Sequence, residues 1–137
     1  MSRTLVRRVS IFAVLASVVG ILLLTLTPLG AGPAGAWGDV CALGVPCSLG
    51  HAAAFLVLGM ALAGWYATSQ AARRSPARIL VMLLLGLWIF AALDEMAQSL
   101  VGREAELSDW ITDMVGGLLG LFGGSALLRL VMQVLRR

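Results

Sequence analysis

Four long apolar runs follow one another along the chain, separated by short stretches that are polar or rich in Pro and Gly. The runs extend over Val9 to Leu29, Leu49 to Thr68, Ile79 to Leu100 and Trp110 to Met132. A helix that crosses a hydrocarbon core of about 30 Å needs roughly 20 mainly apolar residues, and each run is about that long. The pattern therefore predicts an all-α protein, an integral membrane bundle of four transmembrane helices.

The composition is typical of a membrane protein. Of the 137 residues, 60% are hydrophobic and 12% are charged, and the mean hydropathy is +0.96. So few charged residues could not cover the surface of a soluble domain of this size. The ten basic residues, all Arg, form no basic and aromatic face, so the net charge of +3 does not indicate nucleic-acid binding. We expect one membrane domain over residues 1–137, with no nucleic-acid partner and no cofactor.

The arginines predict the orientation of the four helices. Nine of the ten lie before the first run, between the second and third runs, or near the C-terminus, and only Arg103 lies in another loop. Arg near a helix end is retained on the cytoplasmic side during insertion. Both termini should therefore be cytoplasmic, with loops 30–48 and 102–109 on the extracytoplasmic side of a bacterial inner membrane.

The first run has an alternative interpretation as a signal peptide. Arg7 and Arg8 precede it, and the segment Ala34 to Ala36 resembles a small-residue cleavage site. A run of about 20 apolar residues is, however, longer than the usual 7 to 15 of a signal peptide. A membrane anchor is the favoured interpretation.

The third run ends in polar residues that lie inside the predicted outer part of the bilayer. Asp94 and Glu95 follow an apolar stretch, and Gln98 comes one turn later. A charge at the centre of a membrane helix costs about 2.5 to 3.5 kcal/mol, and less toward the interface. Glu95 and Gln98 share a helix face, whereas Asp94 points about 100° away from Glu95, so the two acids need not face one cavity. Such residues need a partner or a function.

The fourth run carries two acids near its predicted outer end. Asp109 and Asp113 are four residues apart, where the helix dipole favours anions, and Asp109 could also act as a cap. The face of Asp113 continues through Gly116, Gly120 and Gly124. Small residues at this spacing are typical of close helix contact in lipid, so the stripe predicts packing and directs Asp113 into the bundle.

His51 opens the second run at the same predicted level as these acids. A lone interfacial His is usually a neutral hydrogen-bonding residue, but here other ionisable residues from separate helices accompany it. The topology brings them toward one membrane face, and a structural salt-bridge and hydrogen-bond network between helices is the alternative. The candidate catalytic residues are Glu95, Asp113 and His51, and the candidate ligand-binding residues are Arg103, Gln98, Asp109 and Asp94.

The two cysteines share the predicted outer loop. An oxidising compartment favours a short-range disulfide between Cys41 and Cys47. Cys47 and His51 could instead bind a metal, with Glu95 or Asp113 as a further ligand, but no recognised zinc spacing is present. The sequence therefore predicts a disulfide and no metal site.

These residues together resemble the signature of VanZ-like membrane proteins. The segment Asp94 to Gln98, followed by Arg103, Asp109 and Asp113, is similar to that signature, and His51 with the Ala-Ala-Ala-Phe that follows it resembles the second-helix motif of the family. The Asp-Lys pair that commonly precedes the family's His is replaced here by Cys47-Ser48. The resemblance implies a membrane protein whose namesake confers resistance to teicoplanin-type glycopeptides.

Two hypotheses of function follow. In the first, the protein binds or modifies an anionic lipid-linked molecule of the cell envelope: Arg103 holds a phosphate or carboxylate, and Glu95, Asp113 and His51 orient the head group or exchange protons. The partner is then a membrane lipid or a lipid-linked envelope precursor. In the second, the protein is a non-enzymatic partner subunit or a small transporter that uses the same groups as a structural network or a proton relay.

Overall fold

The computed structural model describes residues 3–27, 47–102 and 105–134, apart from the side chains of Arg3, Cys47 and Met132. These residues form five helices, of which all but the short α4 are long and apolar enough to cross a membrane. The helices are α1 (Arg3–Thr25), α3 (Cys47–Thr68), α4 (Gln70–Arg74), α5 (Pro76–Leu100) and α6 (Leu107–Val134). The prediction of an all-α chain with four membrane-spanning helices is confirmed.

The ends of α1 differ from the predicted ones. The helix begins at Arg3, six residues before the predicted Val9, because the backbone of an arginine-rich segment is as suited to a helix as that of an apolar one. It ends at Thr25, four residues before the predicted Leu29. Pro28 disfavours helical geometry in the residue before it, so the helix stops short of the proline.

The predicted break between the second and third runs contains the short helix α4. Ser69 begins this helix by accepting a hydrogen bond from the backbone N–H of Ala72 through its side chain. Pro76 then occupies the first turn of α5, where its missing N–H costs nothing. Two helix starts, one capped by Ser and one opened by Pro, thus reverse the chain between α3 and α5.

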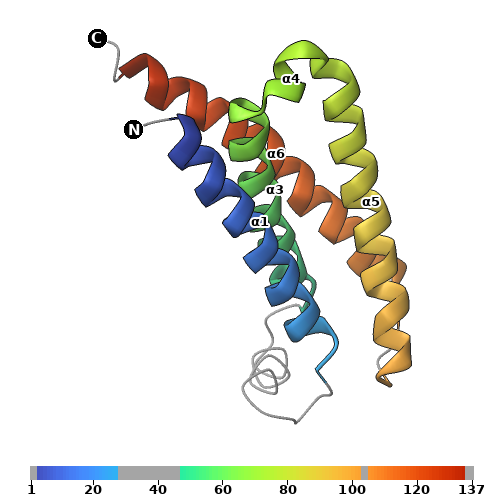
Figure 1. The fold of residues 1–137 in the computed structure, drawn as a ribbon. Helices are drawn as coiled ribbons and strands as arrows, with labels where there is room; N and C mark the ends of the chain where they lie inside the picture. Colours follow the sequence, from blue (N-terminus) through green and yellow to red (C-terminus); the bar gives the residue numbers. More distant parts are fainter. Residues whose placement is uncertain (1–2, 28–46, 103–104, 135–137) are drawn as a thin grey trace.

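The four long helices run alternately up and down (Figure 1). The start of α1, the end of α6 and the helix α4 lie at one end of the bundle. The ends of α1 and α5 and the starts of α3 and α6 lie at the other, which we call the polar end. Which side of the membrane the polar end faces remains a prediction.

The tightest helix contact in the described part of the chain joins α3 to α6. A Cβ atom added at Gly116 would overlap the carbonyl oxygen of Ala52, and one added at Gly120 would overlap that of Leu56. At Gly124 an added Cβ would lie 3.0 Å from the Cβ of Ala63. The predicted role of this glycine stripe in close helix packing is confirmed.

A small apolar core fills the centre of the bundle, and the outward faces of the helices carry exposed apolar side chains suited to lipid. Phe55 belongs to this core and Phe90 packs against it, and the centroids of their rings are 5.6 Å apart. Trp88 of α5 lies outside this core and is 43% exposed. The buried apolar residues are Ile21, Phe55, Leu58, Ala63, Ala72, Leu87, Ala91 and Leu121.

Candidate functional site

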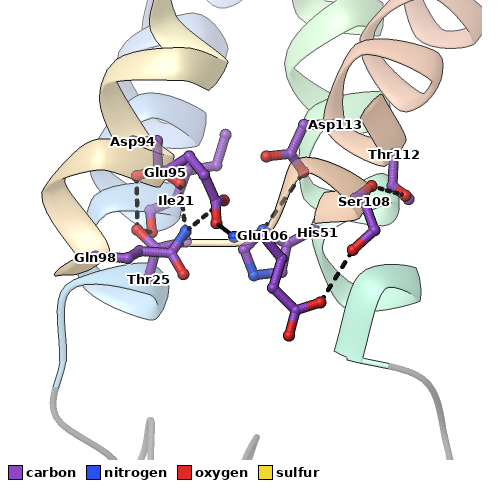
Figure 2. A network of polar contacts seen from close by, with 10 residues as sticks. All are labelled: Ile21, Thr25, His51, Asp94, Glu95, Gln98, Glu106, Ser108, Thr112 and Asp113. Carbon is purple, nitrogen blue, oxygen red and sulfur yellow. Dashed lines mark hydrogen bonds and ion pairs between the residues drawn. The ribbon is translucent and has the colours of Figure 1, made fainter. Parts of the chain in front are cut away.

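Buried polar side chains gather at the polar end of the bundle, and each of the four long helices contributes at least one of them (Figure 2). A polar group without compensation costs several kcal/mol in an apolar medium, so a cluster of this size must be hydrogen-bonded, ion-paired or occupied. We call it the polar cluster. Its members are Thr25 of α1, His51 of α3, Asp94, Glu95 and Gln98 of α5, and Asp113 of α6.

Asp94 is held by residues from two helices. The hydroxyl of Thr25 donates to Asp94 Oδ1 at 2.7 Å, and the amide of Gln98 donates to Asp94 Oδ2 at 3.5 Å. Thr25 Oγ1 also lies 2.9 Å from the carbonyl oxygen of Ile21, so its single proton is shared between two acceptors. Asp94 is thereby fixed at the contact between α1 and α5, where it is 1% exposed.

Glu95 connects α5 to the segment that leads into α6. Its Oε2 accepts a hydrogen bond from Gln98 Nε2 at 3.3 Å, and its Oε1 accepts one from the backbone N–H of Glu106. The amide of Gln98 therefore lies between the carboxylates of Glu95 and Asp94. Although these two acids leave α5 in different directions, both are buried, because other parts of the chain cover this end of α5 on both sides.

His51 and Asp113 face each other between α3 and α6. His51 Nδ1 lies 3.4 Å from Asp113 Oδ1, and Asp113 is completely buried. Neither oxygen of its carboxylate has a hydrogen-bond partner among the described residues. Asp113 lies one turn before Gly116, and His51 directly precedes Ala52, so the pair sits at the end of the close glycine contact.

His51 and Asp113 also lie close to Asp94. Each of these three buried side chains offers one potential ligand atom, and the three atoms lie within 4.8 Å of one another. The sequence had suggested Cys47 and His51, with Glu95 or Asp113, as the alternative metal-binding set. The structure instead brings Asp94 to His51 and Asp113, which gives a site with nitrogen and oxygen donors only.

The other sequence candidates have different positions. Asp109 lies in the first turn of α6 and is half-buried, where the positive end of the helix dipole favours its charge. Arg103 and Cys41 lie outside the described residues, as does the side chain of Cys47. The role of Arg103 and the disulfide therefore remain predictions.

Two contributors to the polar cluster were missed by sequence reasoning. Thr25 was not among the candidate residues, and the backbone N–H of Glu106 carries no sequence signal. The hydroxyl of Thr25 could have been suspected, because it lies at the end of the first run, at the same predicted level as Asp94. No periodicity, however, indicates which helix it would contact.

A comparison with protein families supports the resemblance found in the sequence. The model of the family described as VanZ/LLP1 matches residues 5–129, which is most of the chain and includes every member of the polar cluster. No curated protein and no solved structure matches.

Proposed function

The chain belongs to the VanZ/LLP1 family, and we propose that it binds an anionic, lipid-linked molecule of the cell envelope at the polar end of its bundle. One observation carries this proposal: of the eight buried polar side chains in the described part of the chain, six, drawn from four helices, meet at a single end of the bundle. Intramembrane ionisable residues are costly and mark functional sites by default. A lipid head group is the polar molecule most available at this depth.

The proposal places the polar end on the extracytoplasmic side. Seven of the ten arginines lie in the described helix segments at the other end of the bundle, and arginine-rich segments are retained in the cytoplasm. The ligand would then be a lipid or lipid-linked precursor of the outer leaflet of a bacterial inner membrane.

Arg103 is the proposed anion-binding residue. It lies in the connection between Leu100, which ends α5, and Leu107, which begins α6. Its planar guanidinium can donate two parallel hydrogen bonds to one phosphate or carboxylate, a geometry that Lys cannot reproduce. It is also the only basic residue between Arg78 and Arg129 in the sequence. Arg103 is therefore the arginine in the α5–α6 region of the sequence that could bind an anion at the polar end.

The members of the polar cluster would act on the other polar groups of the ligand. Glu95, Asp113 and His51 are proposed to orient the head group or to exchange protons with it. Gln98 and Asp94 are proposed to hold these groups in place, because the Gln98 amide already bridges two carboxylates. Asp109, at the start of α6, would contribute at the rim of the site.

An apolar cavity in the same bundle supports a lipid as the ligand. It has a volume of about 300 Å³ and lies between α1, α3 and α5, which also carry Thr25, His51 and Asp94. Its α5 residue, Leu83, precedes Asp94 by 11 residues, or about 16 Å along the helix. A head group at the polar end could thus direct a hydrocarbon chain toward this cavity. The cavity is lined by Ile11, Val14, Leu15, Leu62, Trp65 and Leu83.

Lipid selectivity tests the proposal directly. The full chain would be placed in nanodiscs that contain phosphatidylglycerol, a polyprenyl phosphate and phosphatidylcholine, and the co-released lipids would be counted by native mass spectrometry. We expect retention of an anionic lipid, and Arg103→Gln should lower it about tenfold, because a charge-assisted hydrogen bond contributes about 1.5 to 3 kcal/mol. Arg78→Gln, at the other end of α5, is the matched control. Equal retention of anionic and zwitterionic lipids, or equal retention by the wild type and Arg103→Gln, would refute the proposal.

The hydrogen bonds between helices support a second candidate function. Thr25 of α1 donates a hydrogen bond to Asp94 of α5. Glu95 of α5 accepts one from Gln98 and one from the backbone N–H of Glu106, just before α6. A partner subunit or a small transporter could use such a network for structure or for proton transfer. Glu95→Gln separates these roles, because the Gln side chain has the same size and can still form hydrogen bonds but has no titratable carboxyl group. If it abolishes lipid retention or proton transfer while the stability is unchanged, the group is functional, whereas a structural residue should affect stability alone.

The family resemblance also connects the proposal to glycopeptide resistance. If the chain acts as the family's namesake does, its expression in a susceptible host should raise the inhibitory concentration of teicoplanin. Glu95→Gln should abolish that increase. An unchanged inhibitory concentration in cells that contain the folded protein would exclude this role.

A further inference from the structure

We propose that His51, Asp94 and Asp113 form a site for one divalent transition-metal ion inside the membrane domain. The three residues come from α3, α5 and α6, all three are buried, and their potential ligand atoms lie within 4.8 Å of one another. The site does not depend on the proposed lipid ligand, because its donors belong to the protein alone. In Figure 2, Asp94 lies on the α1 and α5 side of the polar cluster, and His51 and Asp113 lie on the α3 and α6 side.

The distances are close to those of a metal site. Zinc binds nitrogen and oxygen ligands at about 2.0 to 2.2 Å, so ligand atoms around a tetrahedral ion are about 3.3 to 3.5 Å apart. His51 Nδ1 and Asp113 Oδ1 already have this spacing, at 3.4 Å. The widest pair, at up to 4.8 Å, exceeds this spacing by about 1.4 Å, which small joint adjustments of the three side chains can supply without moving a helix.

The carboxylate of Asp113 independently indicates a missing ligand. Both of its oxygens are fully buried, and neither has a hydrogen-bond partner in the described part of the chain. A buried, unsatisfied carboxylate oxygen costs several kcal/mol, and most such atoms in native proteins have a protein, water or ion partner. A cation between Asp113 and Asp94 would satisfy the Asp113 carboxylate and would also remove the repulsion between the two carboxylates.

Residues around the three donors resemble the outer shell of a metal site. Metal-binding carboxylates are usually hydrogen-bonded in turn, which fixes their orientation. Asp94 has this support from the hydroxyl of Thr25 at 2.7 Å and from the amide of Gln98 at 3.5 Å. The donor Asp94 is therefore already oriented, which lowers the entropic cost of binding an ion.

The donor set points to the class of ion. An imidazole suits Zn²⁺ and the later transition metals, whereas carboxylates alone suit Mg²⁺ and Ca²⁺. One imidazole with two carboxylates therefore favours Zn²⁺ or Mn²⁺ over Mg²⁺ and Ca²⁺. Three protein ligands also leave one coordination position open, as in sites where an ion contacts a further ligand.

Metal content of the full chain tests the site. The protein would be purified in detergent through a tag without histidine, stripped with a chelator, and titrated with Zn²⁺ and with Mg²⁺ by calorimetry. We expect one Zn²⁺ per chain and at least tenfold weaker binding of Mg²⁺. Asp113→Asn and His51→Gln should each weaken Zn²⁺ binding at least tenfold, whereas Glu106→Gln, an exposed acid before α6, should leave it unchanged.

A spectroscopic measurement on the unaltered protein protects the test against misfolded variants. His51 is the only histidine in the sequence, so a pulsed electron paramagnetic resonance signal from imidazole nitrogen coupled to bound Mn²⁺ would assign the ion to this residue. Failure of the stripped wild-type protein to bind Zn²⁺ would overturn the proposal. Binding without nitrogen coupling, or binding unchanged in both folded variants, would overturn it equally.

Discussion

Replacing Gly120 by Ala tests how the structure assembles its central helix pair. An added Cβ at this position would overlap the carbonyl oxygen of Leu56 and would also lie 2.9 Å from the backbone nitrogen of Met60. Both obstacles are backbone atoms of α3, which cannot rotate away as a side chain can. The two helices must therefore separate locally to accept a single methyl group.

The cost of that separation can be worked out from the contact. Non-bonded heavy atoms reach optimal contact at about 3.5 to 4.0 Å, so α3 must withdraw from Gly120 by more than about 1 Å. A gap of 0.5 to 1 Å loses about a quarter to a half of each dispersion contact, and the loss extends to neighbours such as Gly116 and Gly59, whose backbones also touch the facing helix. Overpacking of this kind typically costs about 1 to 3 kcal/mol. We expect Gly120→Ala to lower the free energy of unfolding by that amount.

Gly123→Ala is the matched control, because it makes the same change on the same helix. An added Cβ at Gly123 meets nothing within 4 Å, and Ala is favoured over Gly in a helix by about 1 kcal/mol. Unfolding of both variants and the wild type would be followed by circular dichroism in mixed micelles with increasing sodium dodecyl sulfate. If Gly120→Ala were as stable as Gly123→Ala, the direct backbone contact between α3 and α6 would be wrong.

Three further changes test other parts of the structure. Thr25→Val removes the hydroxyl that donates to Asp94 and should lower the free energy of unfolding by about 1 to 3 kcal/mol, whereas Thr25→Ser should keep most of it; equal stability of all three proteins would show that this bond contributes nothing. Reporter enzymes fused after Arg74 and at the C-terminus should both read cytoplasmic, and an external C-terminus would reject the topology. Thiol reagents without reductant should fail to label Cys41 and Cys47 if they form a disulfide, and ready labelling of both would exclude it.

The sequence predicted those features of the fold that depend on local spacing. The length of an apolar run reports a membrane-spanning helix directly, because the bilayer has a fixed thickness. The spacing of Gly116, Gly120 and Gly124 likewise reports a narrow face on one helix, whatever its partner is. The boundary errors at the start of α1 arose because hydropathy identifies the buried part of a helix, and a helix can extend beyond it into polar residues such as Arg7 and Arg8.

Features that depend on contacts between distant helices could not be predicted in this way. Thr25 and Asp94 are 69 residues apart, and their hydrogen bond exists only because α1 meets α5 at the polar end. Trp88 shows a second limit. In a bilayer, an apolar side chain can pack in the protein core or face the lipid, so hydropathy does not distinguish a core residue from a lipid-facing one. The angle of about 100° between Asp94 and Glu95 was a sound local inference. It did not reveal that both directions lead into protein.

The contact between α3 and α6 links the stability of the fold to the geometry of the polar cluster. His51 and Asp113 extend from these two helices at the end of the glycine contact, so the close approach of the backbones sets their separation of 3.4 Å. Asp94 and Glu95 come from α5, which has far less contact with α1 and α3 than α3 has with α6. Small shifts of α5 would therefore cost less than separation of α3 from α6. The positions of Asp94 and Glu95 are also held by two hydrogen bonds from outside α5, one from the hydroxyl of Thr25 and one from the backbone N–H of Glu106, which tie this end of α5 to its neighbours.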